Sequence, residues 1–501
     1  MLHNLFLLLP IVAALPARPA LPELTVSQWS NIQSGFVNGA KDLGEWSFGK
    51  AHEIIDSVQD EIDAVVAHQN SGDETQETIW KKLKDDPHSF SKLTNVIDFV
   101  GGTAREILDD GKLQITFFAP NNDALTPPEH HHHHHDDDHA ELTALMANPS
   151  LATVSSLLDR QPAYLLEDDH RDHHGHHGGD SDEDKKRKRE IFKKIAAKVL
   201  AYHGLPKAYT ASDLAQNSTL ETALKAGRGG GGGLYRRIRV EKSLLPPSLK
   251  INFYARVLVS DIKAKNGYLH TINRPLLPPG SIFESLYAFP DFFSTVTSAV
   301  QGTDGRHYLD YAYDRNASKP GHPEFTGSPL ATFFAPTNAA FALLPPKLKF
   351  FLFSPFGKRV LAKVLAYHYI PHSLVLSEFQ YHEKHEKRSF IEAAEGMFNV
   401  ADDPSFRQEL EVHTGLPNST LKLVLEKKKV LPIDSAIKTS ITVNGHAVET
   451  IDVPARNGAF HVINKVLVPP HHHHDDEGND LSAQDSWANW EQWLPAWAEQ
   501  A

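Results

Sequence analysis

Histidine is the residue type in this 501-residue chain whose number and spacing most directly suggest chemistry. Many of the 31 histidines stand in three runs beside acidic residues, and the members of these runs are His130, His131, His132, His133, His134, His135, His173, His174, His176, His177, His471, His472, His473 and His474. Neutral imidazole binds Zn²⁺, Cu²⁺ or Ni²⁺, and neighbouring carboxylates raise the local concentration of cations. The runs are therefore candidate sites for an adventitious or regulatory metal, while no cofactor is expected to be required.

Two other interpretations of these tracts stay open. They can be solvated low-complexity loops, because runs of histidine bind metal in vitro whatever their function. They can also respond to acidity, because a histidine cluster gains positive charge as the pH falls through about 6.5. Protonation would then offset the negative charge of the acidic neighbours.

Four further histidines recur at matching positions in the two halves of the chain, namely His203, His270, His368 and His461. Catalysis by histidine needs a nucleophile or a carboxylate at a fixed spacing. The two halves share no such partner, and the chain has no cysteine for thiol chemistry. We therefore expect these histidines to form structural hydrogen bonds and the protein not to be an enzyme. A hydrolase that uses them is the competing hypothesis.

The segments that position these histidines belong to an internal repeat. The stretch ITFFAPNNDAL, from Ile115 to Leu125, matches ATFFAPTNAAF, from Ala331 to Phe341, at seven of eleven positions. Three more pairs follow the same order along the chain, namely IWKKLKDDPHSF with IFESLYAFPDFF, VLAYHGLP with VLAYHYIP, and NGYLHTINRPLLPP with NGAFHVINKVLVPP. Four ordered matches predict that a whole module occurs twice.

The repeated stretches predict particular elements. The two Thr-Phe-Phe-Ala runs are typical of short buried strands that end at the following proline, and the next polar residues can cap a helix or close a turn. The helical spacing before each Tyr-His pair places that pair near the C-terminus of a helix. Each Asn-Gly pair, at 266–267 and 457–458, predicts a tight turn that leads into a strand.

As a set, these motifs resemble the fasciclin (FAS1) domain, in an arrangement like that of secreted fungal-type proteins. The family's marks are a TVFAPTNxAF-like strand, a YH pair and an NGxxHxIxxxLxPP strand. The second copy matches closely, and the first departs from the pattern at Asp123, Leu125, Thr271 and Pro275. The resemblance implies an α+β fold, with a wedge of β-sheet and helices packed on one side. It also implies binding without catalytic residues, and it transfers candidate binding contacts onto Tyr202, His203, Tyr367 and His368.

The predicted organisation is a signal peptide at 1–20, a helical extension at 21–75, a first module at 76–279, a second module at 280–470 and a His/acidic and Trp-rich tail at 471–501. The apolar run from Leu5 to Ala14 is too short to span a bilayer comfortably and is followed by small residues, as in a secretory signal. A disordered insertion rich in His and acidic residues is expected at about 126–190. It includes the basic run Lys185–Arg189, which we expect to lie in an exposed loop.

Charge and composition limit the partners. The net charge of −13 argues against a nucleic-acid-binding protein, and no second apolar run of membrane length follows the signal, so no transmembrane span is expected in the mature chain. Three sequons predict glycosylation at Asn217, Asn316 and Asn418. The predicted partner is a protein or carbohydrate at the cell surface or in the matrix.

The two ends carry further signals. Apolar positions between Ile54 and Val66 predict an amphipathic helix. Near the C-terminus, Trp487, Trp490, Trp493 and Trp497 form one stripe on a helix, which can pack on the protein itself or meet a membrane, a sugar or a partner.

The function predicted from the whole sequence is adhesion or matrix-type binding, secreted or at the cell surface. The alternative is a protein of the vacuolar or lysosome-like lumen whose His tracts respond to pH or metal.

Overall fold

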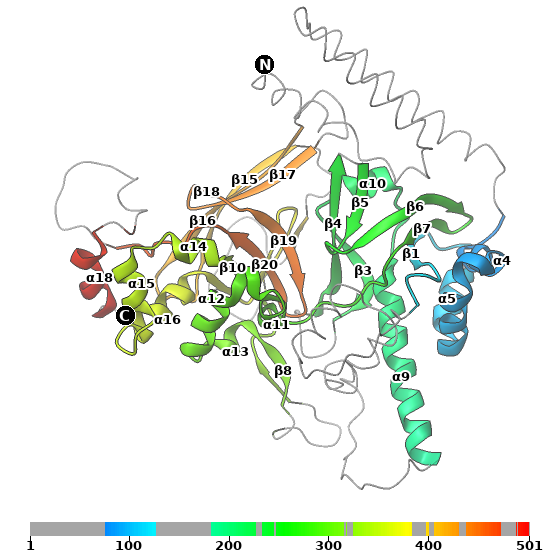
Figure 1. The fold of residues 1–501 in the computed structure, drawn as a ribbon. Coiled ribbons are helices and arrows are strands. Elements are labelled where there is room, and N and C mark those ends of the chain that lie inside the picture. The colour runs from blue at the N-terminus through cyan, green and yellow to red at the C-terminus, as the bar shows by residue number, and fades with distance from the viewer. Residues whose placement is uncertain are drawn as a thin grey trace, which may run out of the picture.

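The computed structural model describes residues 76–126, 182–226, 233–244, 247–314, 317, 324–382, 397–399, 405–429, 437–471, 487 and 489–499 (Figure 1). The predicted signal peptide, the helical extension and most of the His-rich insertion lie outside these residues. Among the described helices, none combines the length and the continuous apolar run needed to cross a bilayer.

The described part of the first half of the chain forms one sheet with helices packed against it. Its elements are α4 (Ile79–Asp85), α5 (Pro87–Val100), α6 (Thr103–Asp109), β1 (Ile115–Pro120), α9 (Asp182–His203), β2 (Gly204–Leu205), α10 (Ala211–Ala215), β3 (Thr219–Lys225), β4 (Tyr235–Leu244), β5 (Pro247–Ile251), β6 (Ala255–Ala264) and β7 (Gly267–Ile272). The strands form a single sheet in the order β2-β1-β7-β6-β5-β4-β3.

The second half repeats this plan with its strands divided among several sheets. Its elements are α11 (Ile282–Tyr287), α12 (Pro290–Gly302), α13 (Arg306–Leu309), β8 (Tyr311–Tyr313), β9 (Phe325–Gly327), β10 (Ala331–Pro336), α14 (Asn338–Ala342), α15 (Pro346–Leu352), α16 (Lys358–Tyr367), β11 (Tyr369–Pro371), β12 (Ser373–Val375), β13 (Phe379–His382), β14 (Met397–Asn399), β15 (Phe406–His413), β16 (Thr420–Lys429), β17 (Ile437–Val443), β18 (His446–Ala447), β19 (Thr450–Ala455), β20 (Gly458–Ile463) and α18 (Trp490–Glu499). The sheet orders are β11-β10-β20-β19, β12-β13-β14, β15-β16-β17-β18 and β8-β9.

Two strands from distant parts of the sequence lie side by side at the centre of each module. Strand β1 pairs in parallel with β7, and β10 pairs in parallel with β20, in the same register. All six residues of β1 and all six of β10 are buried, as the sequence predicted for the Thr-Phe-Phe-Ala runs. Each run ends at its proline, and Thr337 then caps α14 by accepting a hydrogen bond from the Ala340 amide.

The two adjacent phenylalanines of each run point to opposite faces of the sheet, because side chains alternate along a strand. Phe117 packs in the cluster formed with α4, α5 and α9, whereas Phe118 packs in a second cluster with the remaining strands. Phe333 and Phe334 divide in the same way between the helical core and the strand core of the second module. The paired aromatics therefore join two cores across one strand.

The Asn-Gly pairs do form turns, although each turn lies one residue earlier than expected. Residues 265–266 and 456–457 make the turns, and each glycine is already the first residue of its strand. Gly267 and Gly458 have φ of 127° and 134°, and a Cβ on either would lie 1.8 Å from the carbonyl oxygen of the neighbouring strand's first residue. Glycine is therefore required by close backbone approach within the parallel pair.

The asparagine of each pair also joins distant segments. The side chain of Asn266 accepts a hydrogen bond from the Ile79 amide, and Asn457 accepts the equivalent bond from Ile282, at 2.8 and 2.9 Å. These contacts hold the start of the first helix of each module against the strand turn.

Helix α9 begins at Asp182, inside the region expected to be a disordered insertion. The basic run Lys185–Arg189 is therefore helical, which corrects the prediction of an exposed loop. Two physical reasons favour this start: Asp182, Glu183 and Asp184 stand at the positive end of the helix dipole, and long basic side chains are good helix formers. The helix ends at His203, as predicted from the spacing of its apolar residues.

We expect Gly458→Ala to destabilise the protein severely, by more than about 3 kcal/mol, because the new Cβ collides with backbone that cannot move without breaking the parallel pair. The matched control is Gly445→Ala, whose φ is also positive at 79° but whose Cβ has no atom within 4 Å. We expect that change to cost about 1 kcal/mol. Urea unfolding of both variants measures the difference, and equal losses would show that the close approach is unimportant.

Candidate functional site

The histidines of the two Tyr-His pairs are buried, and both ring nitrogens of each are occupied. His203 Nδ1 donates to the Val199 carbonyl at 2.7 Å, and its Nε2 accepts from the Leu276 amide at 2.9 Å. His368 repeats this pattern with Val364 and Leu467, at 2.8 and 3.0 Å. Each ring therefore links the last helical turn to the segment that follows β7 or β20.

The other matched pair of histidines is equally constrained. His270 Nε2 donates to the Tyr209 carbonyl at 3.0 Å, and its Nδ1 accepts from the Asp261 amide at 3.2 Å. His461 makes the equivalent bonds, at 2.8 Å to the Val375 carbonyl and at 3.1 Å from the Asp452 amide. These geometries require the neutral tautomer of each ring, since one nitrogen donates and the other accepts.

Burial keeps the four rings neutral. It lowers the pKa of His203 and of His368 to about 4, although the backbone carbonyl that each ring contacts acts in the opposite direction. It also lowers the pKa values of His270 and His461, where a nearby aspartate partly opposes the effect. The prediction that these residues form structural hydrogen bonds agrees with every one of these contacts.

Two aspartates that the sequence reasoning missed complete the arrangement. Asp261 and Asp452 each precede their histidine by nine residues and have φ of 57° and 60°, in the left-handed region. The side chain of Asp261 accepts from the Ala211 amide at 2.7 Å, and that of Asp452 accepts from the Ser377 amide at 2.8 Å. The shared D-x8-H spacing in the two copies is the signal that would have revealed them.

Ser377, Asp452 and His461 are the described residues that most resemble a catalytic triad. The geometry does not support that chemistry, because the Ser377 hydroxyl hydrogen-bonds Asp452 and not the histidine. His461 Nε2 is already bonded to the Val375 carbonyl, and all three side chains are fully buried. A nucleophile also needs access to substrate, and this fully buried serine has none.

The two tyrosines predicted as binding contacts lie beneath the surface. The Tyr202 hydroxyl donates to the Arg237 carbonyl and accepts from Asn252, both at 2.9 Å. Tyr367 has the matching partners Thr420 and Asn444. A ligand at either site would therefore contact residues around the Tyr-His pair, because the rings themselves are inaccessible.

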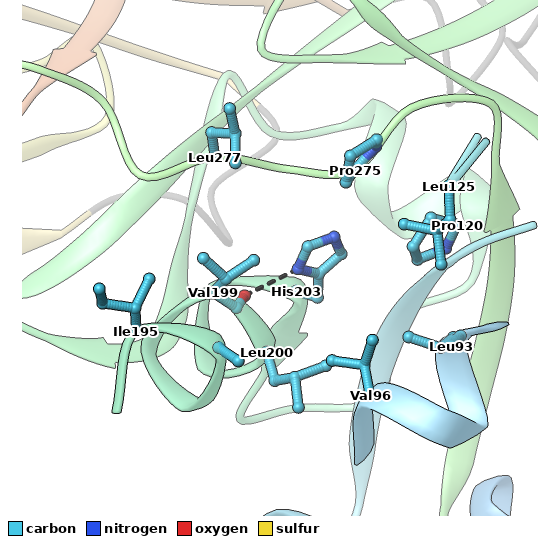
Figure 2. A pocket seen from close by; sticks show the side chains of 11 residues that line it. Leu93, Val96, Pro120, Leu125, Ile195, Val199, Leu200, His203, Pro275 and Leu277 are labelled. Atoms are coloured by element: carbon cyan, nitrogen blue, oxygen red, sulfur yellow. Dashed lines mark hydrogen bonds between the residues drawn. The ribbon is translucent and has the colours of Figure 1, made fainter. Parts of the chain in front are cut away.

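A small apolar cavity of about 40 Å³ lies beside His203 in the first module (Figure 2). It is bounded by α5, α9 and the segment after β7, and its lining residues are Leu93, Val96, Pro120, Leu125, Ile195, Ala196, Val199, Leu200, His203, Pro275 and Leu277. The histidine is the only polar side chain among them, and both of its nitrogens are already hydrogen-bonded. The lining offers no group that could orient a reacting molecule.

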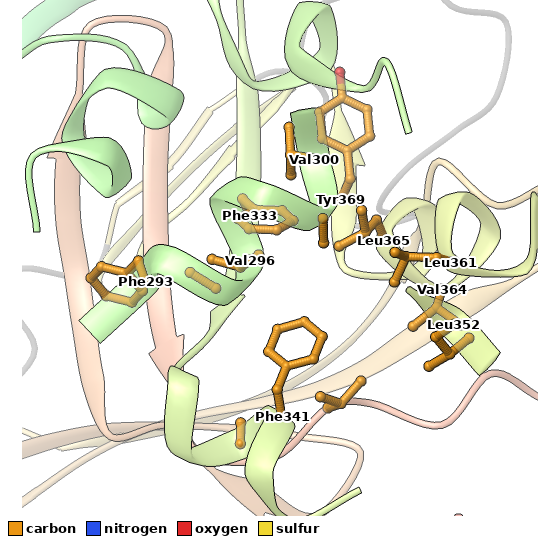
Figure 3. Packing of buried hydrophobic residues seen from close by; sticks show 14 of the residues in the cluster. Phe293, Val296, Val300, Phe333, Phe341, Leu352, Leu361, Val364, Leu365 and Tyr369 are labelled. Carbon is orange, nitrogen blue, oxygen red and sulfur yellow. The ribbon is translucent and has the colours of Figure 1, made fainter. Parts of the chain in front are cut away.

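The C-terminal segment packs in the helical core of the second module. Figure 3 shows Phe293, Phe333 and Phe341 packed with the leucines of α15 and α16, and the C-terminal segment adds Trp487, Trp493 and Leu494 to the same cluster. The Trp487 indole donates to the Val466 carbonyl at 3.0 Å. The predicted tryptophan stripe therefore packs on the chain's own second module.

The comparison with known protein families also finds two matching regions in the chain. The model of the fasciclin domain matches residues 181–278 and 322–469. The chain is a fasciclin-domain protein with two fasciclin modules. This confirms the resemblance based on the repeated motifs, together with the α+β fold class.

Individual relatives cover only part of this chain. Aurofusarin biosynthesis cluster protein S of Gibberella zeae is 32% identical over 146 residues, which are 28% of this chain and 32% of that protein. Stabilin-1 of Homo sapiens is 36% identical over 127 residues, which are 25% of this chain and 5% of that protein. The chain thus spans less than a third of the length of either relative. The solved FAS1 domain pair of the insect cell adhesion molecule fasciclin I aligns with 76% of this chain and 97% of its own, at 15% identity and a TM-score of 0.27.

Most of the predicted metal tracts lie outside the described residues, and so does Asn316. His471, the first residue of the third tract, stacks on Trp493 with ring centroids 3.9 Å apart, and its Nδ1 contacts the Pro469 carbonyl. Within the part of the chain that the structure describes, no group of three or more potential ligands could hold a metal ion. Of the described sequons, Asn418 is exposed, whereas Asn217 is half-buried and donates to the Asp213 carbonyl.

The two fasciclin modules meet through a buried polar interface that the sequence did not predict. Glu378 of the second module accepts from the Ser218 amide of the first at 2.9 Å, and it lies 2.8 Å from the Lys427 ammonium. Glu378 and Lys427 are almost fully buried. Burial raises the pKa of Glu378, and the ion pair with Lys427 and the Ser218 amide partly oppose this.

Further contacts extend this interface. Strand β19 of the second module lies beside β4 of the first (Figure 1), and the Arg239 side chain donates to the Ile451 carbonyl at 3.0 Å. The guanidinium of Arg237 lies 4.5 Å from the ring centroid of Phe379. These bonds make the two modules one unit with a defined relative orientation.

We expect the free energy of unfolding to fall as the pH drops from about 6.5 to about 4. The unfolded histidines bind protons at their ordinary pKa, whereas buried His203 and His368 resist protonation until about pH 4. Each should therefore cost roughly 3 kcal/mol of stability over that interval. Urea unfolding at several pH values measures this loss.

The control is the double variant His203→Gln/His368→Gln, which cannot gain these protons. It should be less stable near neutrality but show a flatter dependence on pH. A loss of stability as steep as that of the unsubstituted protein would contradict the assignment.

We expect Glu378→Ala to destabilise the protein by about 3–5 kcal/mol, because it removes the carboxylate that faces the buried Lys427 ammonium. The matched control is Glu409→Ala, which removes an exposed carboxylate that contacts Arg407 and Lys422. That change should cost less than about 1 kcal/mol. Thermal unfolding should also become broader or biphasic for Glu378→Ala. A single sharp transition with little loss of stability would show that this interface does not couple the unfolding of the two modules.

Proposed function

We propose that this protein is a non-catalytic binding protein that mediates adhesion or matrix-type contact. The observation that carries the proposal is the state of the repeated histidines. In both modules they are buried and neutral, with both ring nitrogens bonded to backbone, so the polar residues that the modules share maintain the fold. Fasciclin domains are linked to cell adhesion. Because the shared polar residues are committed to the fold, we assign binding to the outer surface of the modules.

The buried interface between the modules supports multivalent binding. Two modules held in one orientation present two surfaces at a fixed separation, so a second contact follows the first at high effective concentration. Weak contacts by single modules then add to useful avidity. The ligand we propose is a protein or a carbohydrate at the cell surface or in the matrix.

The proposed location is outside the cell or at its surface, in accord with the signal-like sequence at 1–20 and the exposed sequon at Asn418. The second candidate is the lumen of a vacuole or lysosome-like compartment. It is favoured by the acid-flanked His tracts, which would gain charge or hold metal there. Fractionation of the native protein into medium, surface and vacuole, with its N-terminus sequenced, distinguishes the two.

The adhesion test uses the full purified chain coated on a surface. We expect attachment of cells from the source organism to rise above that on an albumin-coated surface and to be inhibited by the soluble chain. Glu378→Ala, which loosens the relative orientation of the modules, should weaken attachment more than Glu409→Ala. Attachment equal to the albumin control would reject the proposed function.

A further inference from the structure

The segment that joins α14 to α16 exposes large hydrophobic side chains. Phe356, Phe350 and Leu343 are 88%, 81% and 76% exposed, and they are the most exposed large hydrophobic side chains among the described residues. Phe353, between them, is also exposed. We call Leu343, Phe350, Phe353 and Phe356 the α15 patch.

The patch is held rigidly by the elements beneath it. Leu348 and Leu352 are buried in the core of the second module, so the other face of α15 is directed outward. The turn after the helix is closed by the Ser354 hydroxyl, which donates to the Phe351 carbonyl at 2.6 Å, and by the Gly357 amide, which donates to the Ser354 carbonyl. A Cβ at Gly357 would lie 2.0 Å from the Phe351 carbonyl oxygen, so the chain folds back tightly beside Phe356.

Positive charge surrounds these apolar side chains. Although the chain as a whole has a net charge of −13, no Asp or Glu occurs from Phe325 to Ser377. Exposed basic residues flank the patch, namely Lys347, Lys349, Lys358 and Arg359. Two acidic residues from other elements face them, since Glu491 lies 3.7 Å from Lys347 and Asp304 lies 2.7 Å from Lys358.

Exposed phenylalanine beside lysine and arginine matches the chemistry of an anionic bilayer surface, where aromatic rings enter the interface and basic groups meet acidic headgroups. A second copy of the chain fits this surface poorly, because facing patches would bring their basic residues together. The patch also lies on α15, close to α16 and α18, at the end of the molecule opposite α4 and α5 (Figure 1). Docking there leaves the first module directed away from the membrane.

We propose that the α15 patch docks on the surface of a bilayer that contains anionic lipid. The rings of Phe350 and Phe356 enter the interfacial region, and Lys349 and Arg359 contact the headgroups. This inference goes beyond adhesion, because it gives a chain whose described helices cannot span a bilayer a direct means of attachment to one.

The test is co-sedimentation of the full chain with vesicles of phosphatidylcholine, with or without phosphatidylserine. We expect binding to the phosphatidylserine vesicles, weakened by salt, and little binding to phosphatidylcholine alone. Phe350→Ser/Phe356→Ser should weaken binding at least about tenfold, since two apolar side chains no longer enter the interface. Lys349→Glu/Arg359→Glu should weaken it similarly.

The control is Phe292→Ser, which removes a phenylalanine that is 60% exposed on α12, outside the patch. It should bind vesicles as the unsubstituted chain does, and circular dichroism should show that all variants are folded. Absence of binding to anionic vesicles, or binding that the patch variants retain, would overturn the proposal. Concentration-dependent dimerisation that is lost in Phe350→Ser/Phe356→Ser, without vesicle binding, would assign the patch to a second copy instead. Because no cells are involved, these outcomes are independent of the adhesion test.

Discussion

Each module depends on the close parallel pairing of two strands that are far apart in the sequence. A parallel pair cannot be closed by a short hairpin, so the intervening chain must cross over, and here it forms the helices on one face and the further strands on the other. At Gly267 and Gly458 the two backbones approach so closely that no side chain fits. The asparagine before each glycine then holds the first helix of the module. Register, helix placement and the division of the core all follow from this pairing.

The buried histidines provide hydrogen-bond partners for backbone groups that the crossover leaves outside the central strands. Chain segments that leave the central strands carry backbone amides and carbonyls with no partner in a sheet, and such groups are costly when buried. A neutral imidazole satisfies one donor and one acceptor at once, and His203 and His368 do so between a helix end and the segment after β7 or β20. Both nitrogens of each ring are engaged with buried backbone groups and not with a nucleophile.

The two modules share this framework but differ in what covers it. In the second, the tryptophan segment joins the helical core, whereas a small cavity lies beside His203 in the first. The modules are joined by Glu378, which belongs to the second and accepts a hydrogen bond from the first. The second module also carries the exposed α15 patch with its basic flank. The differences therefore lie in interfaces and surfaces, where packing of the central strands imposes no constraint.

The sequence by itself determined the repeat, the two buried strands of each module and the helix end at each Tyr-His pair, because strand propensity and helical spacing are local properties. It also favoured hydrogen bonding over catalysis for the matched histidines. Only the tertiary structure decided which groups those histidines contact, that Glu378 faces Lys427 of β16, and that Phe350 and Phe356 are exposed. Local pattern gives Phe350 and Phe356 the same hydrophobic character as the buried Phe333 and Phe334. Their environments differ because burial depends on which elements cover a residue, and that is settled only when segments distant in sequence pack together.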